Sequence, residues 1–217
     1  MSHPPCLTRR HHDSRPALTL WGEVSFPLAR VHEICGPARW TLALWIAARA
    51  GGPLIWIAPD RTGEEMTAPG IRGLMDAGQL LRVRPEKSGD MFWTMEESLR
   101  SGAAPVVAME LTAPPGITPV RRLHLAAEAG ARAGMGMPLG LVLTPEDGGA
   151  QAIETRWRLD PFWPGAWRLT RLRARMYPPR SWYVVLEREA GGRPALREVS
   201  PGAAIGAAQS VPLAMVG

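Results

Sequence analysis

Short, mainly apolar runs alternate along the first two thirds of the chain with segments whose apolar residues recur at helical spacing. These runs predict strands at residues 30–35, 53–58, 80–83, 105–111 and 139–143, of which 53–58 and 139–143 are apolar throughout. The helical stripes predict helices at residues 38–50, at 91–101 with Asp90 as N-cap, and from Pro119 onward with Thr118 as N-cap. Strands that are apolar throughout are typical of a parallel sheet with helices on both faces. We therefore expect an α/β fold with a mostly parallel central sheet.

Beyond residue 150 the pattern changes to simple alternation. Residues 153–159 alternate between apolar and charged side chains, which predicts a half-exposed strand. Two further strands are predicted around Trp167 and across 182–186, on either side of a turn at Tyr177-Pro-Pro. These strands would extend the sheet in antiparallel fashion. We expect residues 1–20 to form a flexible arm, 21–190 the folded domain, and the Gly-, Ala- and Pro-rich residues 191–217 a disordered tail.

Composition narrows the class of protein. The chain has 217 residues, 25 basic and 20 acidic, and its basic residues are almost all arginine, with Lys87 the single lysine. Cys6 and Cys35 are far apart and form neither a disulfide framework nor a metal motif, which favours a reducing cytoplasm. No secretory signal pattern and no uninterrupted apolar span is visible, so we expect no membrane insertion. The cysteine spacing also gives no reason to expect a metal, and we expect no cofactor.

The turn after the first predicted sheet strand stands where a phosphate-binding loop would stand in a nucleotide-binding fold. That loop requires G-x-x-x-x-G-K-[ST], in which backbone N–H groups and the lysine hold phosphates and the hydroxyl holds magnesium. This chain has Gly36-Pro-Ala-Arg-Trp-Thr41, without the second glycine and without the lysine. The residues of this vestigial nucleotide site are Gly36, Pro37, Arg39, Thr41 and, at the end of a later strand, Glu110. We expect no catalysis, and the helix N-terminus leaves weak anion or ATP binding open.

Several ordered segments resemble recombinase A. They are Phe26-Pro-Leu-Ala-Arg-Val-His-Glu-Ile-Cys-Gly-Pro37, Ser88-Gly-Asp with Glu96-Glu-Ser-Leu-Arg-Ser-Gly-Ala103, Pro105–Leu111, and Arg171-Leu-Arg-Ala-Arg-Met-Tyr-Pro-Pro179. The resemblance implies a core of the recombinase-A type with a P-loop topology. Both DNA-binding loops of that family would be shortened here, and its C-terminal domain and long N-terminal helix have no counterpart.

Other phrases are more similar to the ImuA family, the recombinase-like accessory proteins of a bacterial mutagenic system. They are Met95-Glu-Glu-Ser-Leu-Arg-Ser-Gly-Ala103, residues 111–131 and Pro138-Leu-Gly-Leu-Val-Leu-Thr-Pro145. The resemblance implies an accessory role in damage-induced (SOS), error-prone translesion synthesis and DNA repair. The implied partners are ImuB, an inactive relative of Y-family polymerases, and an error-prone replicative-type polymerase, with recombinase A as a further candidate.

Arginines and tryptophans are interleaved near the end of the folded domain. The arginines are Arg156, Arg158, Arg168, Arg171, Arg173, Arg175 and Arg180, and the tryptophans Trp157, Trp163, Trp167 and Trp182. Such a set suits single-stranded DNA or an acidic protein partner. Alternation equally allows the tryptophans to face the core while the arginines line a solvated face.

Two other functions remain open at this stage. One is a weak ATPase of the recombinase-A type, and the other is an inhibitor of cell division resembling SulA, another shortened recombinase-like protein. The apolar end of the chain, Ser210–Gly217, is either a docking peptide for a partner or an inert terminus.

Overall fold

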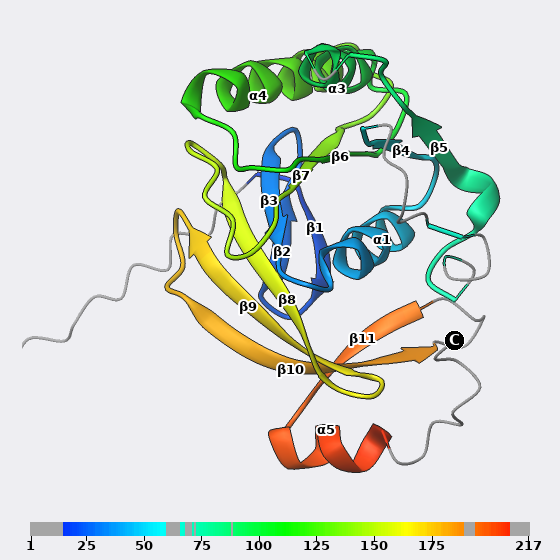
Figure 1. The fold of residues 1–217 in the computed structure, drawn as a ribbon, viewed down its shortest axis with the longest axis vertical. Coiled ribbons are helices and arrows are strands. Elements are labelled where there is room, and N and C mark those ends of the chain that lie inside the picture. The colour runs from blue at the N-terminus through cyan, green and yellow to red at the C-terminus, as the bar shows by residue number, and fades with distance from the viewer. Residues whose placement is uncertain are drawn as a thin grey trace, which may run out of the picture.

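A computed structural model describes residues 15–59, 66–67, 71, 73–87, 89–188 and 194–208 of the chain. Within these residues, nine strands form one mixed sheet in the order β11-β10-β9-β8-β3-β7-β6-β4-β5 (Figure 1). These strands are β3 (Val31–Cys35), β4 (Leu54–Ile57), β5 (Leu80–Val83), β6 (Val106–Glu110), β7 (Leu139–Leu143), β8 (Thr155–Trp163), β9 (Ala166–Ala174), β10 (Arg180–Arg188) and β11 (Pro194–Val199).

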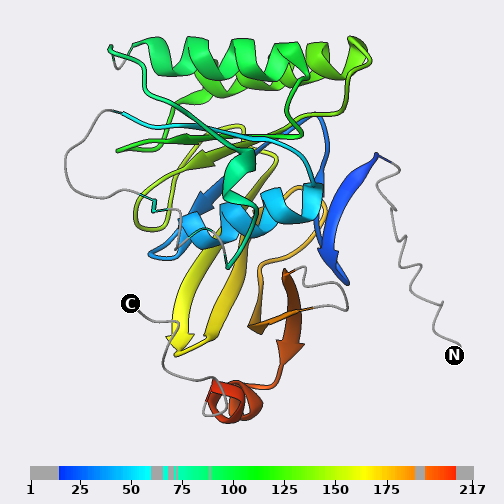
Figure 2. The same cartoon turned by 90° about the vertical axis from the view of Figure 1, so that its right-hand side faces the viewer.

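The strands from β8 to β5 across the sheet run parallel, and helices cover both faces of this part. The covering helices are α1 (Arg39–Ala50), α3 (Asp90–Ser101) and α4 (Ile117–Arg132). Figure 2 shows α3 and α4 side by side on one face and α1 on the other. Two apolar clusters follow from this layering, one around Leu42 and Trp56 beneath α1 and one around Met95 and Leu123 beneath α3 and α4. The predicted α/β fold with a mostly parallel sheet is confirmed.

The remaining elements extend and flank this sheet. Strands β8 to β11 are joined in antiparallel fashion, which confirms the predicted antiparallel extension. A separate hairpin of β1 (Ala17–Trp21) and β2 (Val24–Pro27) packs Val24 and Phe26 into the α1 cluster. A short 3₁₀ turn, η1 (Ala77–Gln79), precedes β5. No helix within the described residues is long and apolar enough to cross a membrane.

Two predicted helix caps are wrong. Asp90 is the first residue of α3, and the capping position is taken by Gly89, which has no side chain to offer. Helix α4 begins at Ile117, so Gly116 is its cap and Thr118 lies inside the first turn. Both helices therefore have a glycine at the capping position. Their stability comes from burying an apolar face, which does not require a capping side chain.

The predicted ends of the domain also need correction. The tail expected to be disordered from residue 191 contains β11 and the helix α5 (Pro201–Ala208), while residues 209–217 lie outside the described residues. Strand β11 forms because backbone groups of β10 pair with it, and Ala204 of α5 is fully buried against the sheet. The arm expected at 1–20 includes β1 from Ala17 onward, and residues 1–14 lie outside the described part.

A fully buried carboxylate, Glu33, lies in the central strand β3. Its oxygens accept hydrogen bonds from the hydroxyl of Thr144 at 2.7 Å and from the backbone N–H groups of Gly149 at 2.8 Å and Ala150 at 3.0 Å. The guanidinium of Arg156 in β8 completes the set with an ion pair. A buried charge is tolerated only when it is paired and hydrogen-bonded, and Glu33 meets both conditions. It ties the loop at 144–150 and β8 to β3.

We predict that Glu33→Gln destabilises the protein by about 3 kcal/mol, because an amide leaves Arg156 uncompensated and points N–H donors at other donors. Urea unfolding at neutral pH measures the change. The control is Glu97→Gln on the exposed surface of α3, where an ion pair with Arg100 is lost, and its expected effect is below about 0.5 kcal/mol. Equal effects of the two substitutions would contradict the assigned role of Glu33.

Helices α3 and α4 lie in close contact at Gly130. A Cβ atom at this position would lie 2.1 Å from the carbonyl oxygen of Leu99 in α3, whereas one at Gly202 in α5 would meet nothing within 4 Å. We predict that Gly130→Ala destabilises by about 2 kcal/mol through overpacking. Gly202→Ala, which makes the same chemical change in open space, should be neutral or stabilise by up to about 1 kcal/mol. Thermal and urea unfolding of the pair would reveal the opposite signs.

Candidate functional site

The turn between β3 and α1 is closed by the protein's own backbone. The N–H of Gly36 donates to the carbonyl of Glu146 at 3.0 Å, and the N–H of Ala38 donates to the carbonyl of Leu159 at 3.1 Å. The N–H of Arg39 donates to the carbonyl of Gly36 at 3.2 Å, and Pro37 has no N–H to offer. Gly36 has a φ of +87°, and a Cβ there would lie 2.7 Å from the Leu159 carbonyl oxygen. The N–H groups of Gly36, Ala38 and Arg39 are therefore already used within the protein and do not point at a bound anion.

The side chains around the turn complete this closure. Arg39 reaches across to Glu110 at the end of β6, with 3.5 Å between Nη2 and Oε1, and its Nη1 lies 3.4 Å from the carbonyl oxygen of Gly36. The structure therefore brings together Gly36, Pro37, Arg39 and Glu110, as the sequence predicts. The hydroxyl of Thr41, in the first turn of α1, makes no hydrogen bond within the described residues. Nowhere in the described chain do three His, Cys, Asp or Glu side chains gather into a metal-binding cluster.

The arginines of residues 156–180 divide into groups with different surroundings. Arg156 is bound to Glu33, as described above. Arg158 pairs with Asp147 and, at 2.8 Å, with Asp160, and Arg168 approaches the same Asp160 at 3.3 Å. Burial opposes the charge on Asp160, but hydrogen bonds and charges from Arg158 and Arg168 outweigh it and hold the pKa of this carboxyl below its ordinary value. These three arginines are engaged within the protein.

Arg171 is buried within a stack of planar groups. Its side chain is 2% exposed, and its guanidinium carbon lies 5.7 Å from the ring centre of Trp157, 5.1 Å from that of Trp182 and 5.0 Å from that of Tyr177. Its Nε donates to the carbonyl of Pro178 at 3.1 Å, and its Nη2 donates to Glu23 at 3.2 Å. The sequence-based alternative that the tryptophans face the core is confirmed for Trp157 and Trp182, since both are buried. Trp163, in contrast, is 46% exposed.

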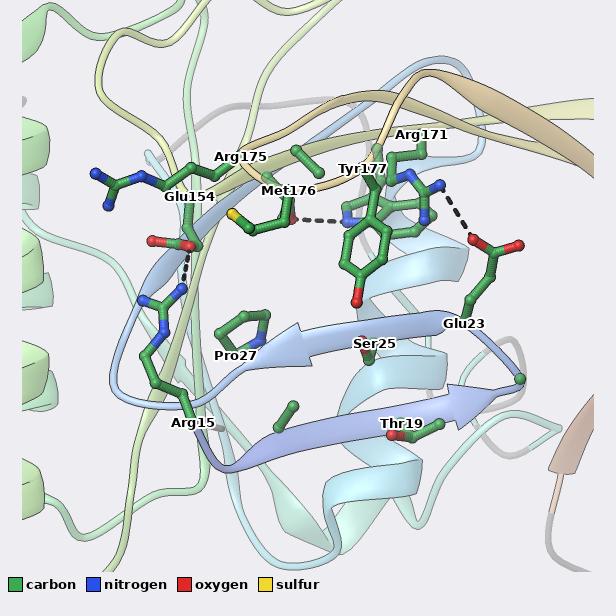
Figure 3. Close-up of a pocket in the computed structure, with 15 residues that line it drawn as sticks. Arg15, Thr19, Glu23, Ser25, Pro27, Glu154, Arg171, Arg175, Met176 and Tyr177 are labelled. Atoms are coloured by element: carbon green, nitrogen blue, oxygen red, sulfur yellow. Dashed lines mark hydrogen bonds and ion pairs between the residues drawn. The ribbon is translucent and has the colours of Figure 1, made fainter. Parts of the chain in front are cut away.

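A pocket of about 380 Å³ opens beside this stack (Figure 3). Its floor is the outward face of the β1–β2 hairpin, where the pairs Ala17–Pro27 and Thr19–Ser25 present small side chains. Its walls are Glu154, Thr155 and Trp157 on one side and residues 174–177, from the end of β9 onward, on the other. Three arginines and two glutamates line it, namely Arg15, Arg171, Arg175, Glu23 and Glu154, which gives a net charge of +1.

The last members of the arginine set lie around this pocket and beyond it. Arg180 pairs with Glu23 and lies over Trp182. Arg175 lines the pocket and Arg173 does not. Both are exposed, and neither forms an ion pair or a hydrogen bond within the described residues. The predicted arginine site is thus not a single surface, because only these two members keep their charge unpaired.

Sequence reasoning missed the other half of the pocket. Arg15 and Glu23 are far from the arginine run in sequence, and the expected flexible arm hid the fact that residues 17–27 form a hairpin. Glu154 lies two residues before Arg156 but was not recognised as part of a site. The alternating Ala17-Leu-Thr-Leu-Trp21 was a signal for a strand with one apolar face. The opposite, small face of that strand is what forms the pocket floor.

A buried chain of hydrogen bonds runs beneath the pocket. The indole N–H of Trp157 donates to the hydroxyl of Thr155 at 2.7 Å, and that hydroxyl donates to Nδ1 of His32 at 2.7 Å. The Nε2–H of His32 then donates to the carbonyl of Pro27 in the hairpin at 2.9 Å. This arrangement is satisfied by a neutral imidazole with its proton on Nε2. Burial lowers the pKa of His32 from 6.5 to about 4.

We predict that the free energy of unfolding decreases as the pH is lowered below about 6.5. Below this pH the unfolded chain binds a proton on His32, whereas the folded protein binds it only near pH 4. The expected loss from this group is about 2 kcal/mol between pH 7 and pH 5. Urea unfolding at the two pH values measures it. His124, whose pKa burial also lowers, adds a loss in the same direction. His32→Gln should leave only that smaller part, and an unchanged pH dependence in this variant would contradict the assignment.

Comparison with known proteins does not assign any of these features. No family model matches the sequence, and no curated protein is significantly similar to it. Function must therefore be argued from the closed turn, the unpaired arginines and the pocket described above.

Proposed function

We propose that the chain is a non-catalytic accessory protein of error-prone translesion synthesis, with a recombinase-A-like core whose nucleotide site has been lost. In this role it links an ImuB-type inactive polymerase to an error-prone replicative-type polymerase, with recombinase A as a further partner. In this proposal the protein acts by binding partners through its surface and carries out no reaction. Its sequence basis is the ordered resemblance across residues 21–187.

One observation carries the non-catalytic part of the proposal, namely the closure of the turn at residues 36–39. A phosphate loop works because several N–H groups converge on the phosphates and a lysine reaches the outer ones. Here Gly36 and Ala38 donate to backbone carbonyls instead, and Arg39 is held by Glu110. Opening the turn for a triphosphate would break these contacts and separate it from the β8 backbone. That cost supports a turn that does not bind ATP.

The adaptor function predicts that the tagged full-length chain, expressed in its own host after DNA damage, co-purifies with an inactive Y-family polymerase relative and an error-prone replicative-type polymerase. Recovery should be the same with and without ATP and magnesium, because no nucleotide site takes part. Mass spectrometry identifies the retained proteins. A tagged chain recovered without either polymerase at micromolar concentration would refute the adaptor role.

The nucleotide part has its own measurement. Calorimetric titration of the purified chain with ATP should show no binding that depends on magnesium or on Arg39, so the curves of the unchanged chain and of Arg39→Ala should coincide. Saturable binding that Arg39→Ala alters would instead establish a working nucleotide site and leave the adaptor role to be judged by co-purification alone.

A further inference from the structure

The pocket beside Arg171 has more hydrogen-bond donors and positive charge than its own acids can satisfy. Glu154 is held by Arg15 at 2.8 Å and by Arg30 at 3.7 Å, and Glu23 is held by Arg171 and Arg180. The acids are thus neutralised from within the protein. A ligand that fits here must bring acceptors and negative charge of its own.

Several donors of the pocket are unused. The guanidinium of Arg175 has no partner within the described residues, and the same holds for the hydroxyls of Thr19, Ser25 and Tyr177. Arg175 lies toward the end where Arg15 and Glu154 meet, and the hydroxyl of Tyr177 points across the pocket toward the hairpin (Figure 3). Cationic and hydroxyl donors therefore surround the space from two sides.

The other end of the pocket offers a planar apolar face. Tyr177 lies on the guanidinium of Arg171, which in turn lies on the buried rings of Trp157 and Trp182. Tyr177 itself is 42% exposed, so the stack ends at a ring that is open to a ligand. The thioether of Met176 lies beside it (Figure 3). A flat heterocycle would extend the stack by one layer, an interaction that aromatic side chains provide for bases in single strands.

We propose that this pocket binds one nucleotide unit, with its phosphate at Arg175 and its base against Tyr177. The volume of about 380 Å³ lies within the range of small-ligand sites. An acidic peptide would use the cation and leave the open ring and the hydroxyl floor unmatched, so the nucleotide accounts for more of the lining. The assignment is independent of the adaptor function, because it concerns a face that lies apart from the closed turn.

The test uses the full-length chain and two probes, a fluorescein-labelled oligothymidylate read by anisotropy and thymidine monophosphate as competitor. Arg175→Gln removes the rim cation, and the matched control Arg173→Gln makes the same change on an exposed residue outside the pocket. We expect Arg175→Gln to weaken binding about tenfold and to reduce the salt dependence by about one unit of slope. Arg173→Gln should change affinity by less than about twofold.

A second pair of variants examines the ring. Tyr177→Phe keeps the stacking surface and removes the hydroxyl, whereas Tyr177→Leu removes the ring. We expect a loss of about threefold or less for the first and about tenfold for the second, since stacking of one base is worth at least about 1 kcal/mol. Circular dichroism confirms that each variant is folded. A ligand bound only through its charge would be indifferent to both changes, and that result would overturn the proposal.

The two probes separate a free nucleotide from a strand. Competition by thymidine monophosphate as strong as that of the unlabelled oligomer identifies a free nucleotide as the ligand, and a much tighter oligomer identifies a single strand. Both results support the pocket. Equal losses for Arg173→Gln and Arg175→Gln, displacement by an oligoglutamate peptide, or no binding of either probe would each overturn it. Co-purification of polymerases is expected to be unchanged in Arg175→Gln, so the two proposals fail separately.

Discussion

The carboxylate of Glu33 sets the geometry of the centre of the sheet. An ionised group that is fully buried must be surrounded by donors, and those of Glu33 come from the loop at 144–150 and from Arg156 in β8. The same loop supplies the carbonyl of Glu146 that accepts from Gly36. Gly148 has no room for a side chain, because a Cβ there would lie 2.6 Å from Glu33. One buried charge thus positions both β8 and the segment that closes the turn.

The same constraint bears on the turn between β3 and α1, which differs from a phosphate loop in its backbone hydrogen bonds as well as in the missing glycine and lysine. A lysine and a second glycine introduced into this turn would not free the N–H groups of Gly36 and Ala38, which would still donate to the carbonyls of Glu146 and Leu159. The unpaired Arg175 and the exposed ring of Tyr177 lie elsewhere, on the hairpin side of the sheet.

Apolar periodicity was sufficient to predict the parallel strands and the helices α1, α3 and α4, because a continuous apolar run or a helical apolar stripe is a pattern within the segment itself. It failed for β11, a short strand whose order depends on pairing with β10, and for α5, whose residues are nearly all small and whose order depends on the burial of Ala204. The arginine run was visible in the sequence, but the sequence did not show which of its arginines form ion pairs and which do not. Whether an arginine is paired depends on distant acids such as Glu23 and Glu33, which only the fold brings near.

The position of β3 has a consequence for how the chain is made. Its neighbours in the sheet are β7 and β8, although β4 follows it directly in sequence. During synthesis β3 leaves the ribosome before β7 and β8 have been made. More than a hundred further residues must be added before β3 can pair and before Glu33 can find its hydrogen-bond partners. Pairing of this central strand is thus postponed until residues 139–163 have been synthesised.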